Sequence, residues 1–446
     1  MPPISRALLI ENATLLSTGG AAAVRRNHSV LIEGGIITRV APRDRIGRFP
    51  GRRIDASGKV AIPGLINCHT HLYSAFARGL TKARPSRDFL SVLRNLWWRL
   101  DSALTTEDCY YSALIALIDS IRHGATTVID HHASPGAVGG SLDAIACAVR
   151  ETGLRACLCY EVSDRDGIRA ARKGLAENVR FIRRCQACDG AHLRALFGLH
   201  ASFTLSDGTL AEAAGLGHDL QTGFHIHAAE AQADQRATRR ASRTGVVERL
   251  KRFGILGKRS IAAHCVHVSR REMGSLAETG TAVAHNPQSN LNNAVGIADV
   301  IEMARRGVVV GLGTDAMTTN MLEELRAALW AQRLASGIPS AGFDEVASAL
   351  FVGNARVAGR IFGLRFGEIR RGCAGDVAIF DYDPPTPLVS ANALSHVLFG
   401  LSQAHVDTTI VGGRVLMEHK RLKLDIDEAR VNARSRELAR NLWQRL

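Results

Sequence analysis

Two His-x-His pairs in the sequence could each supply part of a metal site. His69 and His71 end the stretch PGLINCHTH, and His225 and His227 lie in GFHIHAAE. Because side chains alternate between the faces of a strand, the two histidines of a pair share one face and can bind the same ion. We take His227, the later residue of its pair, as a third nitrogen ligand, and His225 as a core or supporting residue.

Glu230 and His264 could carry the proton transfers of a hydrolysis. Glu230 follows His227 by three residues, where the strand gives way to a loop. Its carboxylate can therefore reach a metal-bound water and shuttle its proton. His264 follows two alanines and faces the opposite way from Cys265. We predict that Glu230 is the general acid/base and that His264 stabilises the attacking hydroxide without binding the metal.

Asp315 ends an apolar run, residues 307–316, that should be buried. An ionised carboxylate there would be costly without a cation, and metal binding removes that cost. Three histidines and one aspartate around an ion that keeps a water describe a catalytic site rather than a structural one. The predicted ligands are His69, His71, His227 and Asp315.

The ligand types favour Zn²⁺, although Fe²⁺ or Mn²⁺ would also fit a shell rich in nitrogen. A site for two ions would need a bridging carboxylate, often a carboxylated lysine on the fourth strand. No lysine lies between Lys173 and Lys251. We therefore expect one divalent ion.

These residues fall at the ends of apolar, strand-length runs that alternate with longer segments of helical pattern. Such alternation predicts a parallel sheet covered by helices, and eight units match a (β/α)₈ barrel, whose active sites lie at the carboxyl ends of the strands. A dinucleotide-binding fold is excluded because Gly311 and Gly313 are not part of a GxGxxG motif. The eight runs are residues 61–71, 125–132, 155–162, 193–200, 223–230, 260–267, 281–287 and 307–316.

The two ends of the chain differ from this middle region in their residue pattern. Short runs rich in aliphatic and β-branched residues are separated by turn residues, which predicts strands at 7–16, 28–40, 52–60, 376–382 and 408–418. Val411–Arg414 should form a tight hairpin turn, and the strands of the two ends should pair. Residues 426–446 show helical spacing and predict a surface helix.

Composition narrows the class of protein. The chain has 446 residues, 46% hydrophobic and 22% charged, as in ordinary globular proteins. Its net charge of +14 comes from scattered arginines without a basic run, so we expect a solvated surface and no nucleic-acid partner. No stretch reaches about 18 apolar residues, which argues against a membrane partner. An odd number of cysteines, nine, and no secretory signal predict a cytoplasmic protein.

The motifs PGLINCHTH, HIHAAE, AAHCV and GLGTDA, in that order, resemble the amidohydrolase superfamily, in its branch of cytosine/guanine deaminases and triazine hydrolases. Finer features are similar to aminohydrolases of the SsnA group. These are HLYSAFARGL, NLWWRLDSAL, VIDHHASP and HNPQSNLNNAVG.

The resemblance implies a small β-sandwich beside the barrel, built from residues 1–60 and 367–446, with the barrel at 61–366. It also implies that His69, His71, His227 and Asp315 bind the metal, that Glu230 moves a proton from water to a ring nitrogen, that His264 positions the hydroxide, and that His200 contacts substrate.

Two departures from the family argue against guanine itself as the substrate. Guanine deaminases tend to have arginine at the position of His200, and glutamine at that of Ser74.

The leading functional hypothesis is hydrolytic deamination of an amino-substituted nitrogen heterocycle that is purine-like, pterin-like or triazine-like. One alternative is a hydrolase that releases an alkylamine or chloride from a heterocycle. The other is a non-catalytic accessory factor of a molybdenum hydroxylase. A small-molecule substrate is the expected partner, and a homodimer is compatible with the sequence.

Overall fold

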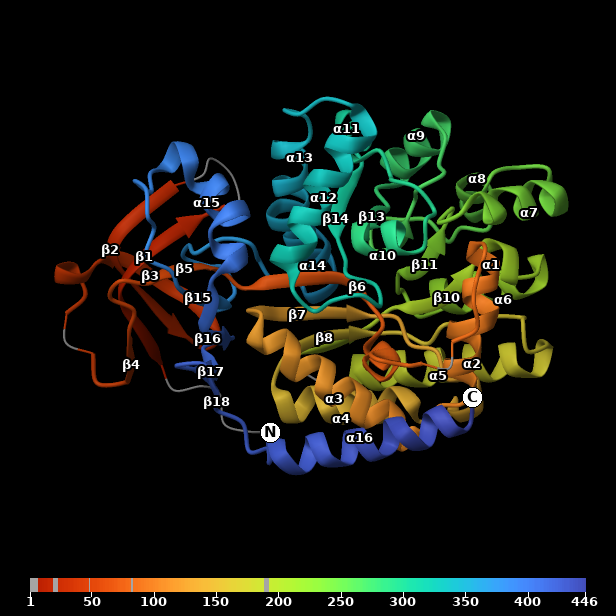
Figure 1. Cartoon of the computed structure of the whole chain (residues 1–446), viewed down its shortest axis with the longest axis horizontal. Coiled ribbons are helices and arrows are strands. Elements are labelled where there is room, and N and C mark those ends of the chain that lie inside the picture. Colours follow the sequence, from red (N-terminus) through yellow and green to blue (C-terminus); the bar gives the residue numbers. More distant parts are fainter. Residues whose placement is uncertain (1–6, 19–22, 48, 82, 188–191) are drawn as a thin grey trace.

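The computed structural model describes residues 7–18, 23–47, 49–81, 83–187 and 192–446. A nine-stranded mixed sheet lies beside a larger α/β region, whose parallel strands are flanked by helices (Figure 1). None of the described helices has the length and apolar character needed to cross a bilayer.

The α/β region contains two parallel sheets, in which every paired strand runs parallel to its neighbour. Each of the eight predicted apolar runs contributes a strand, and the fourth run is divided between the two sheets. Isolated parallel bridges join Val162 to Leu199 and Thr70 to Asp315. The first sheet comprises β6 (Leu65–Thr70), β7 (Ala125–Asp130), β8 (Arg155–Leu158) and β9 (Leu193–Ala195), and the second comprises β10 (Phe197–Ala201), β11 (Phe224–Ala228), β12 (Ile261–His264), β13 (Ala282–His285) and β14 (Val309–Leu312).

Helices follow these strands along the chain and bury one apolar face each. In α5, for example, the long charged helix turns Leu175, Phe181 and Ile182 into the core. The helices of this region are α3 (Thr106–Arg122), α4 (Ser141–Thr152), α5 (Ile168–Ala187), α6 (Asp207–Asp219), α7 (Gln232–Ser242), α8 (Val246–Arg252), α9 (Arg270–Thr279), α10 (Pro287–Asn292), α11 (Val300–Arg305), α12 (Met321–Ser336), α13 (Phe343–Ser348) and α14 (Asn354–Phe362).

The nine-stranded sheet joins the two ends of the chain, as predicted, because β5 pairs antiparallel with β15. Its own apolar core includes Ile10, Val30, Ile54 and Ile379. The strands are β1 (Leu8–Ser17), β2 (Ala23–Glu33), β3 (Ile36–Pro42), β4 (Arg52–Asp55), β5 (Val60–Pro63), β15 (Val377–Asp381), β16 (His405–Val411), β17 (Arg414–Glu418) and β18 (Arg421–Leu422).

Further predicted runs are also divided between two strands. Residues 28–40 form the end of β2 and most of β3, which turn at Gly34 and Gly35 with φ of +59° and +83°. Residues 61–71 form most of β5 in the mixed sheet and all of β6 in the parallel sheet, with Gly64 between them. A Cβ at Gly64 would lie 2.3 Å from Cγ2 of Thr126, so the close packing there needs glycine.

Two features attach the ends of the chain to the α/β region. Arg155 on β8 and Asp376, just before β15, form a buried ion pair. The predicted terminal helix is confirmed as α16 (Glu428–Gln444), which lies along α3 and buries Leu438 and Leu442 (Figure 1).

Candidate active site

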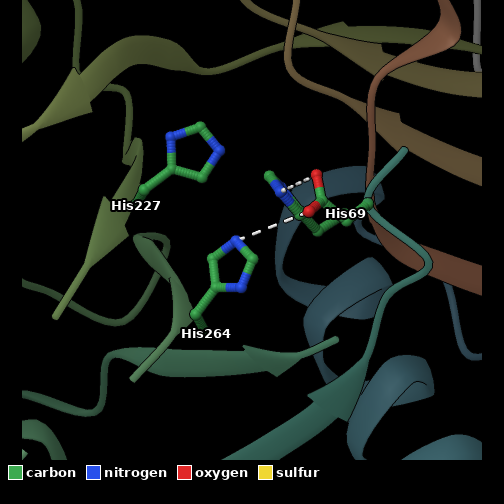
Figure 2. Close-up of side chains that lie close together, drawn as sticks. His69, His227 and His264 are labelled. Atoms are coloured by element: carbon green, nitrogen blue, oxygen red, sulfur yellow. Dashed lines mark ion pairs between the residues drawn. The ribbon is translucent and has the colours of Figure 1, made fainter. Parts of the chain in front are cut away.

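Five side chains meet at the carboxyl ends of the parallel strands, and Figure 2 shows three of them, His69, His227 and His264. His69 and His71 come from the end of β6, His227 from β11, His264 from the end of β12 and Asp315 from just after β14. Oδ1 of Asp315 lies 3.0 Å from Nε2 of His71 and 3.6 Å from Nε2 of His69. Its Oδ2 lies 3.9 Å from Nε2 of His264, and Nε2 of His227 lies 3.2 Å from Nε2 of His71.

The side chains of this cluster fit a metal ion. His69, His227, His264 and Asp315 are buried, and one donor atom of each lies within 4.8 Å of those of the others. His71 belongs to an overlapping group with His227. Nε2 of His69 and Nε2 of His264 are buried without a hydrogen-bond partner among the described residues, and a cation would use such lone pairs.

The structure therefore brings the four predicted ligands together and adds His264 at ligand distance.

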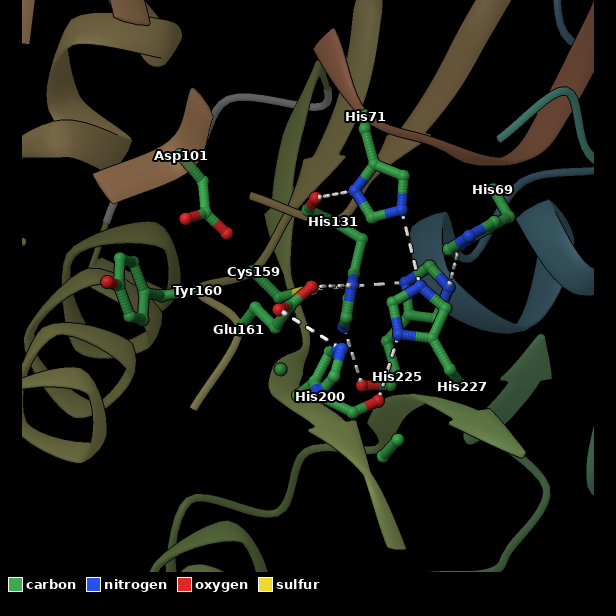
Figure 3. A network of polar contacts seen from close by, with 12 residues as sticks. His69, His71, Asp101, His131, Cys159, Tyr160, Glu161, His200, His225 and His227 are labelled. Carbon is green, nitrogen blue, oxygen red and sulfur yellow. Dashed lines mark hydrogen bonds and ion pairs between the residues drawn. The ribbon is translucent and has the colours of Figure 1, made fainter. Parts of the chain in front are cut away.

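Hydrogen bonds on the other ring nitrogen fix the orientation of each histidine, and Figure 3 shows them for His69, His71 and His227. Nδ1 of His69 contacts Nε2 of His225 at 2.9 Å, and Nδ1 of His264 contacts Oδ1 of Asn290 at 2.8 Å. The other two histidines use backbone carbonyl oxygens: Nδ1 of His71 contacts that of His131 at 2.5 Å, and Nδ1 of His227 contacts that of His200 at 2.9 Å. His225 is thus a supporting residue, as the sequence predicts.

Burial and the Asp315 carboxylate shift the pKa values of these groups in opposite directions. Burial lowers the pKa of His69 to about 3, and it also lowers that of His227. Burial acts in the same sense on His71, but the hydrogen bond and the charge of Asp315 outweigh it and raise the pKa of His71 to about 9. The pKa of Asp315 is well below its usual range, because its close contacts with His69 and His71 outweigh its burial. Metal binding would therefore release the proton of His71.

Glu230 lies beside this cluster, two residues after β11. Its Oε2 is 3.6 Å from Nε2 of His264, and its Oε1 accepts a hydrogen bond of 3.5 Å from Nδ2 of Asn293. Burial raises the pKa of Glu230 to about 7, with His264 opposing the rise and Asp315 adding to it. A carboxyl group with this pKa can both take and give a proton near neutral pH.

The backbone at the site is strained. Ala229, His264 and Asp315 have φ of +49°, +71° and +51°, a region that non-glycine residues adopt at some cost. Such strain often accompanies functional sites because it aims side chains that regular backbone would direct elsewhere.

The cluster opens into a pocket with a cavity volume of about 50 Å³. Its walls are largely aromatic, and Asp101, Glu161, Arg165 and His200 form a polar region beside the cluster. The apolar lining residues are Tyr73, Phe89, Leu93, Trp97 and Trp98. Except for Tyr73, they come from α1 (Phe89–Val92), the π-helical turn Leu93–Trp97 and the start of α2 (Trp98–Ser102).

The polar region is held by ion pairs. Nη2 of Arg165 lies 2.5 Å from Oδ2 of Asp101, and its Cζ lies 5.4 Å from the centre of the Trp98 ring. Burial opposes the ionisation of Glu161, but the charges of His200, His131 and Arg165 and a hydrogen bond from His131 hold its pKa below the usual range. Burial lowers the pKa of His200 to about 4.

Sequence reasoning missed several supporting residues. His131 was not singled out, although its carbonyl oxygen holds His71. In the segment HNPQSNLNN, Ser289 donates a hydrogen bond to Asp315 and Asn293 donates one to Glu230. Repeated polar residues directly after β13 were the only signal for them.

Neighbouring polar and aromatic residues divide between the pocket wall and its surroundings. Glu161, Arg165, Trp97 and Trp98 do line the pocket. Asp164 instead accepts hydrogen bonds from the backbone N–H of Ser206 and from Oγ1 of Thr209. His132 lies outside the lining and contacts Oγ of Ser134.

Known proteins with related sequences identify the family. The sequence profile of the amidohydrolase family matches residues 60–416. The chain belongs to the amidohydrolase family. This amidohydrolase is 34% identical over 448 residues to a 5-methylthioadenosine/S-adenosylhomocysteine deaminase of Desulforudis audaxviator, covering 98% of this chain and 99% of the relative. It is 32% identical over 429 residues to a 5'-deoxyadenosine deaminase of Methanothermobacter thermautotrophicus, and the match covers 94% of this chain and 95% of the relative.

Solved structures agree with this amidohydrolase fold. A zinc-bound adenosine deaminase from Xanthomonas campestris superposes with a TM-score of 0.87 at 24% identity, covering 99% of this chain and 100% of that one. A zinc-bound atrazine chlorohydrolase from Arthrobacter aurescens superposes with a TM-score of 0.84 at 24% identity, and the match covers 97% of this chain and 100% of that one. The amidohydrolase therefore has the α/β TIM-barrel fold, and the predicted superfamily and its deaminase and triazine-hydrolase branch are confirmed.

Proposed function

We propose that this amidohydrolase is a metal-dependent deaminase that replaces the amino group of a nitrogen heterocycle by oxygen. The observation that carries the proposal is the position of Glu230. Its buried carboxyl group, with a pKa near neutrality, stands beside a four-donor metal cluster in the same aromatic pocket. Relatives named as deaminases of adenosine derivatives support the same chemistry.

A single divalent ion, with zinc the first candidate, would be held by His69, His71, His227 and Asp315. When bound, such an ion lowers the pKa of water toward about 7 and so supplies hydroxide at neutral pH. The zinc in both structural neighbours supports this choice. His264 lies near enough to serve as a further ligand, or to hold the nucleophile through Nε2, which is otherwise unpaired among the described residues.

Glu230 would carry the proton. Its carboxylate takes a proton from the attacking water and gives it to the ring nitrogen next to the amino-bearing carbon. The carbon–nitrogen bond to the amino group then breaks, and ammonia leaves with a second proton relayed by Glu230 and Asp315. The aromatic side chains of Phe89 and Trp97 would hold the planar ring and exclude bulk water.

The finer architecture is also part of the proposal. We take the two parallel sheets as one closed eight-stranded barrel over residues 61–366, with a small β-sandwich from 1–60 and 367–446. The bridges Val162–Leu199 and Thr70–Asp315, which join strands at both seams, support closure. The nearer resemblance to the SsnA group stays a prediction.

Ammonia release tests the proposed function. The metal-replete protein is incubated with a panel of aminopurines, aminopurine nucleosides, pterins, aminopyrimidines and aminotriazines. Release from at least one compound, abolished by Glu230→Gln with the metal retained, is the expected result. No release from any member, with one metal ion bound per chain, would reject the deaminase assignment.

A further inference from the structure

The pocket beside the metal cluster is smaller than a six-membered ring requires. Its cavity volume is about 50 Å³. A cavity of about 150 Å³ accommodates benzene, whereas a buried water needs only about 10–15 Å³. In this conformation the pocket therefore has room for a few water molecules and not for a heterocycle. Part of the pocket wall must move before a ring can reach Glu230.

The polar wall of the pocket is fixed. His71, His227 and His264 are at most 8% exposed, and each is held through Nδ1 by a hydrogen bond. They come from the ends of strands whose backbone hydrogen bonds belong to the parallel sheets. Moving this wall would separate the proposed metal ligands, so the space for a ring must come from another side of the pocket.

The apolar wall belongs to a segment with few attachments. Phe89, Leu93, Trp97 and Trp98 lie on α1, the π-helical turn and α2, in the connection between β6 and α3. Phe89 and Leu93 pack in a small apolar cluster that is separate from the main core. Across the described residues, no backbone hydrogen bond joins residues 83–104 to the rest of the chain. Segments with so few bonds open locally at a low cost in free energy.

The backbone on both sides of this wall can act as a hinge. Residues 83–88 are exposed and belong to no helix or strand, and α2 ends at Ser102, before the cap of α3 at Thr105. The π-helical turn lies between α1 and α2, and such turns often occur at functional sites. Helices of four and five residues do not persist in water without their apolar partners. Opening therefore also loosens α1 and α2.

Arg165 holds this segment against the barrel. Its Nη2 lies 2.5 Å from Oδ2 of Asp101 on α2, and its Cζ lies 5.4 Å from the centre of the Trp98 ring. The side chains of Arg165 and Asp101 are 8% and 2% exposed. Within the described part of 83–102, only the Asp101 side chain forms a hydrogen bond or ion pair with a residue outside that range. One buried ion pair thus fastens the apolar wall.

Trp98 contributes in the opposite sense. Its Nε1 is buried without a hydrogen-bond partner in the described structure. In water this N–H would donate a hydrogen bond, so its burial without an acceptor costs free energy. The closed position gains the ion pair and the packing of Phe89 and Leu93, and it loses this hydrogen bond. These opposing contributions keep the free energy of opening small.

We infer that residues 89–102 form a lid over the active site, that the ion pair between Asp101 and Arg165 is its latch, and that the lid opens to admit substrate and to release product. Opening breaks the ion pair and moves Phe89 and Leu93 away from the metal cluster. Closure excludes bulk water from the reacting groups. The inference goes beyond the proposed function, because it holds for any ring that must enter this pocket and for any leaving group.

Hydrogen exchange of the metal-loaded protein, followed by mass spectrometry, tests the lid without a substrate. Peptides from 89–102 should exchange faster than peptides from β7 and β12. Asp101→Asn keeps the shape of the side chain and removes its charge. The loss of a charged hydrogen bond predicts roughly 10- to 100-fold faster exchange in the lid peptides. Asp166→Asn is the matched control, because it removes an exposed carboxylate from the same guanidinium, and it should leave lid exchange unchanged.

The exchange of β7 and β12 is an internal reference, because a general loss of stability in Asp101→Asn would accelerate the barrel strands as well. Lid peptides that exchange as slowly as β7 in the wild type would overturn the inference. Lid exchange that is equal in the wild type and Asp101→Asn would also overturn it, since the ion pair would then not be the latch.

Entry of a ring is measured on the same three proteins after loading with Co²⁺. The probe is pyridine, which has the size of benzene and changes the visible absorption of Co²⁺ when it binds the ion. Asp101→Asn should bind pyridine roughly 10- to 100-fold faster than the wild type, and Asp166→Asn should bind it at the wild-type rate. Equal rates in all three proteins would show that a ring enters without lid opening and would contradict the inference. Neither measurement requires turnover, so a failure of the deaminase assignment in the ammonia screen is separate from a failure of the lid.

Discussion

Replacing Asp315 by asparagine should weaken metal binding far more than it weakens the fold. Asp315 supplies the one carboxylate of the proposed ligand set, and the other three ligands, His69, His71 and His227, are neutral imidazoles when they bind an ion. Zinc sites of four ligands bind with about 10–16 kcal/mol, or about 2.5–4 kcal/mol for each ligand. Loss of one ligand therefore predicts an affinity lower by roughly 70- to 900-fold.

The assay is competition with a chromophoric zinc chelator, with metal content measured after dialysis. Asp425→Asn, at an exposed position before α16, is the matched control and should keep the affinity of the wild type. Metal-free Asp315→Asn should still unfold cooperatively. Wild-type affinity and activity in Asp315→Asn would refute the proposed ligand set.

Three further outcomes follow from the contacts described. Glu230→Gln should lower turnover by roughly 10²- to 10⁴-fold with metal content unchanged, and loss of metal would instead make Glu230 a ligand. Asp376→Asn leaves the buried Arg155 without its anionic partner and should cost about 3–5 kcal/mol in urea unfolding, whereas a cost below about 1 kcal/mol would contradict a structural role for the pair. Asp407 pairs with Lys59 at 2.8 Å, and hydrogen bonds to Lys59 and Thr408 outweigh burial and lower its pKa from 3.8. Because its pKa is lowered in the folded state, the ionised Asp407 carboxylate stabilises the fold above about pH 4, and this stabilisation is lost as the pH falls through the folded-state pKa. Asp407→Asn should therefore flatten the fall in Tm between pH 5 and 3. An unchanged pH profile would contradict this.

The sequence predicts those elements whose residue pattern is local, that is, formed by residues close together in the chain. Apolar runs that carry His71, His227 and His264 at or near their ends predict both strands and the edge where their side chains meet, because barrel strands present their carboxyl ends together. Position along the strand, with His227 nearer its carboxyl end, assigns His225 a supporting place, and Nε2 of His225 does contact Nδ1 of His69.

The rest depends on contacts between residues distant in the chain. The Arg165 guanidinium meets Asp101 across 64 positions, and Asn290 meets His264 across 26, and neither spacing leaves a periodic signal. The division of residues 28–40 into two strands was missed because the aliphatic pattern continues on both sides of Gly34–Gly35.

Hydrolysis in H₂¹⁸O tests the central claim most directly. A substrate found in the ammonia screen is incubated with metal-replete protein, and both products are analysed. Attack of water on the amino-bearing carbon predicts one ¹⁸O atom at that carbon and one ammonia for each molecule of product. Ammonia without ¹⁸O in the ring product, or a ring product that keeps its nitrogen, would contradict the account.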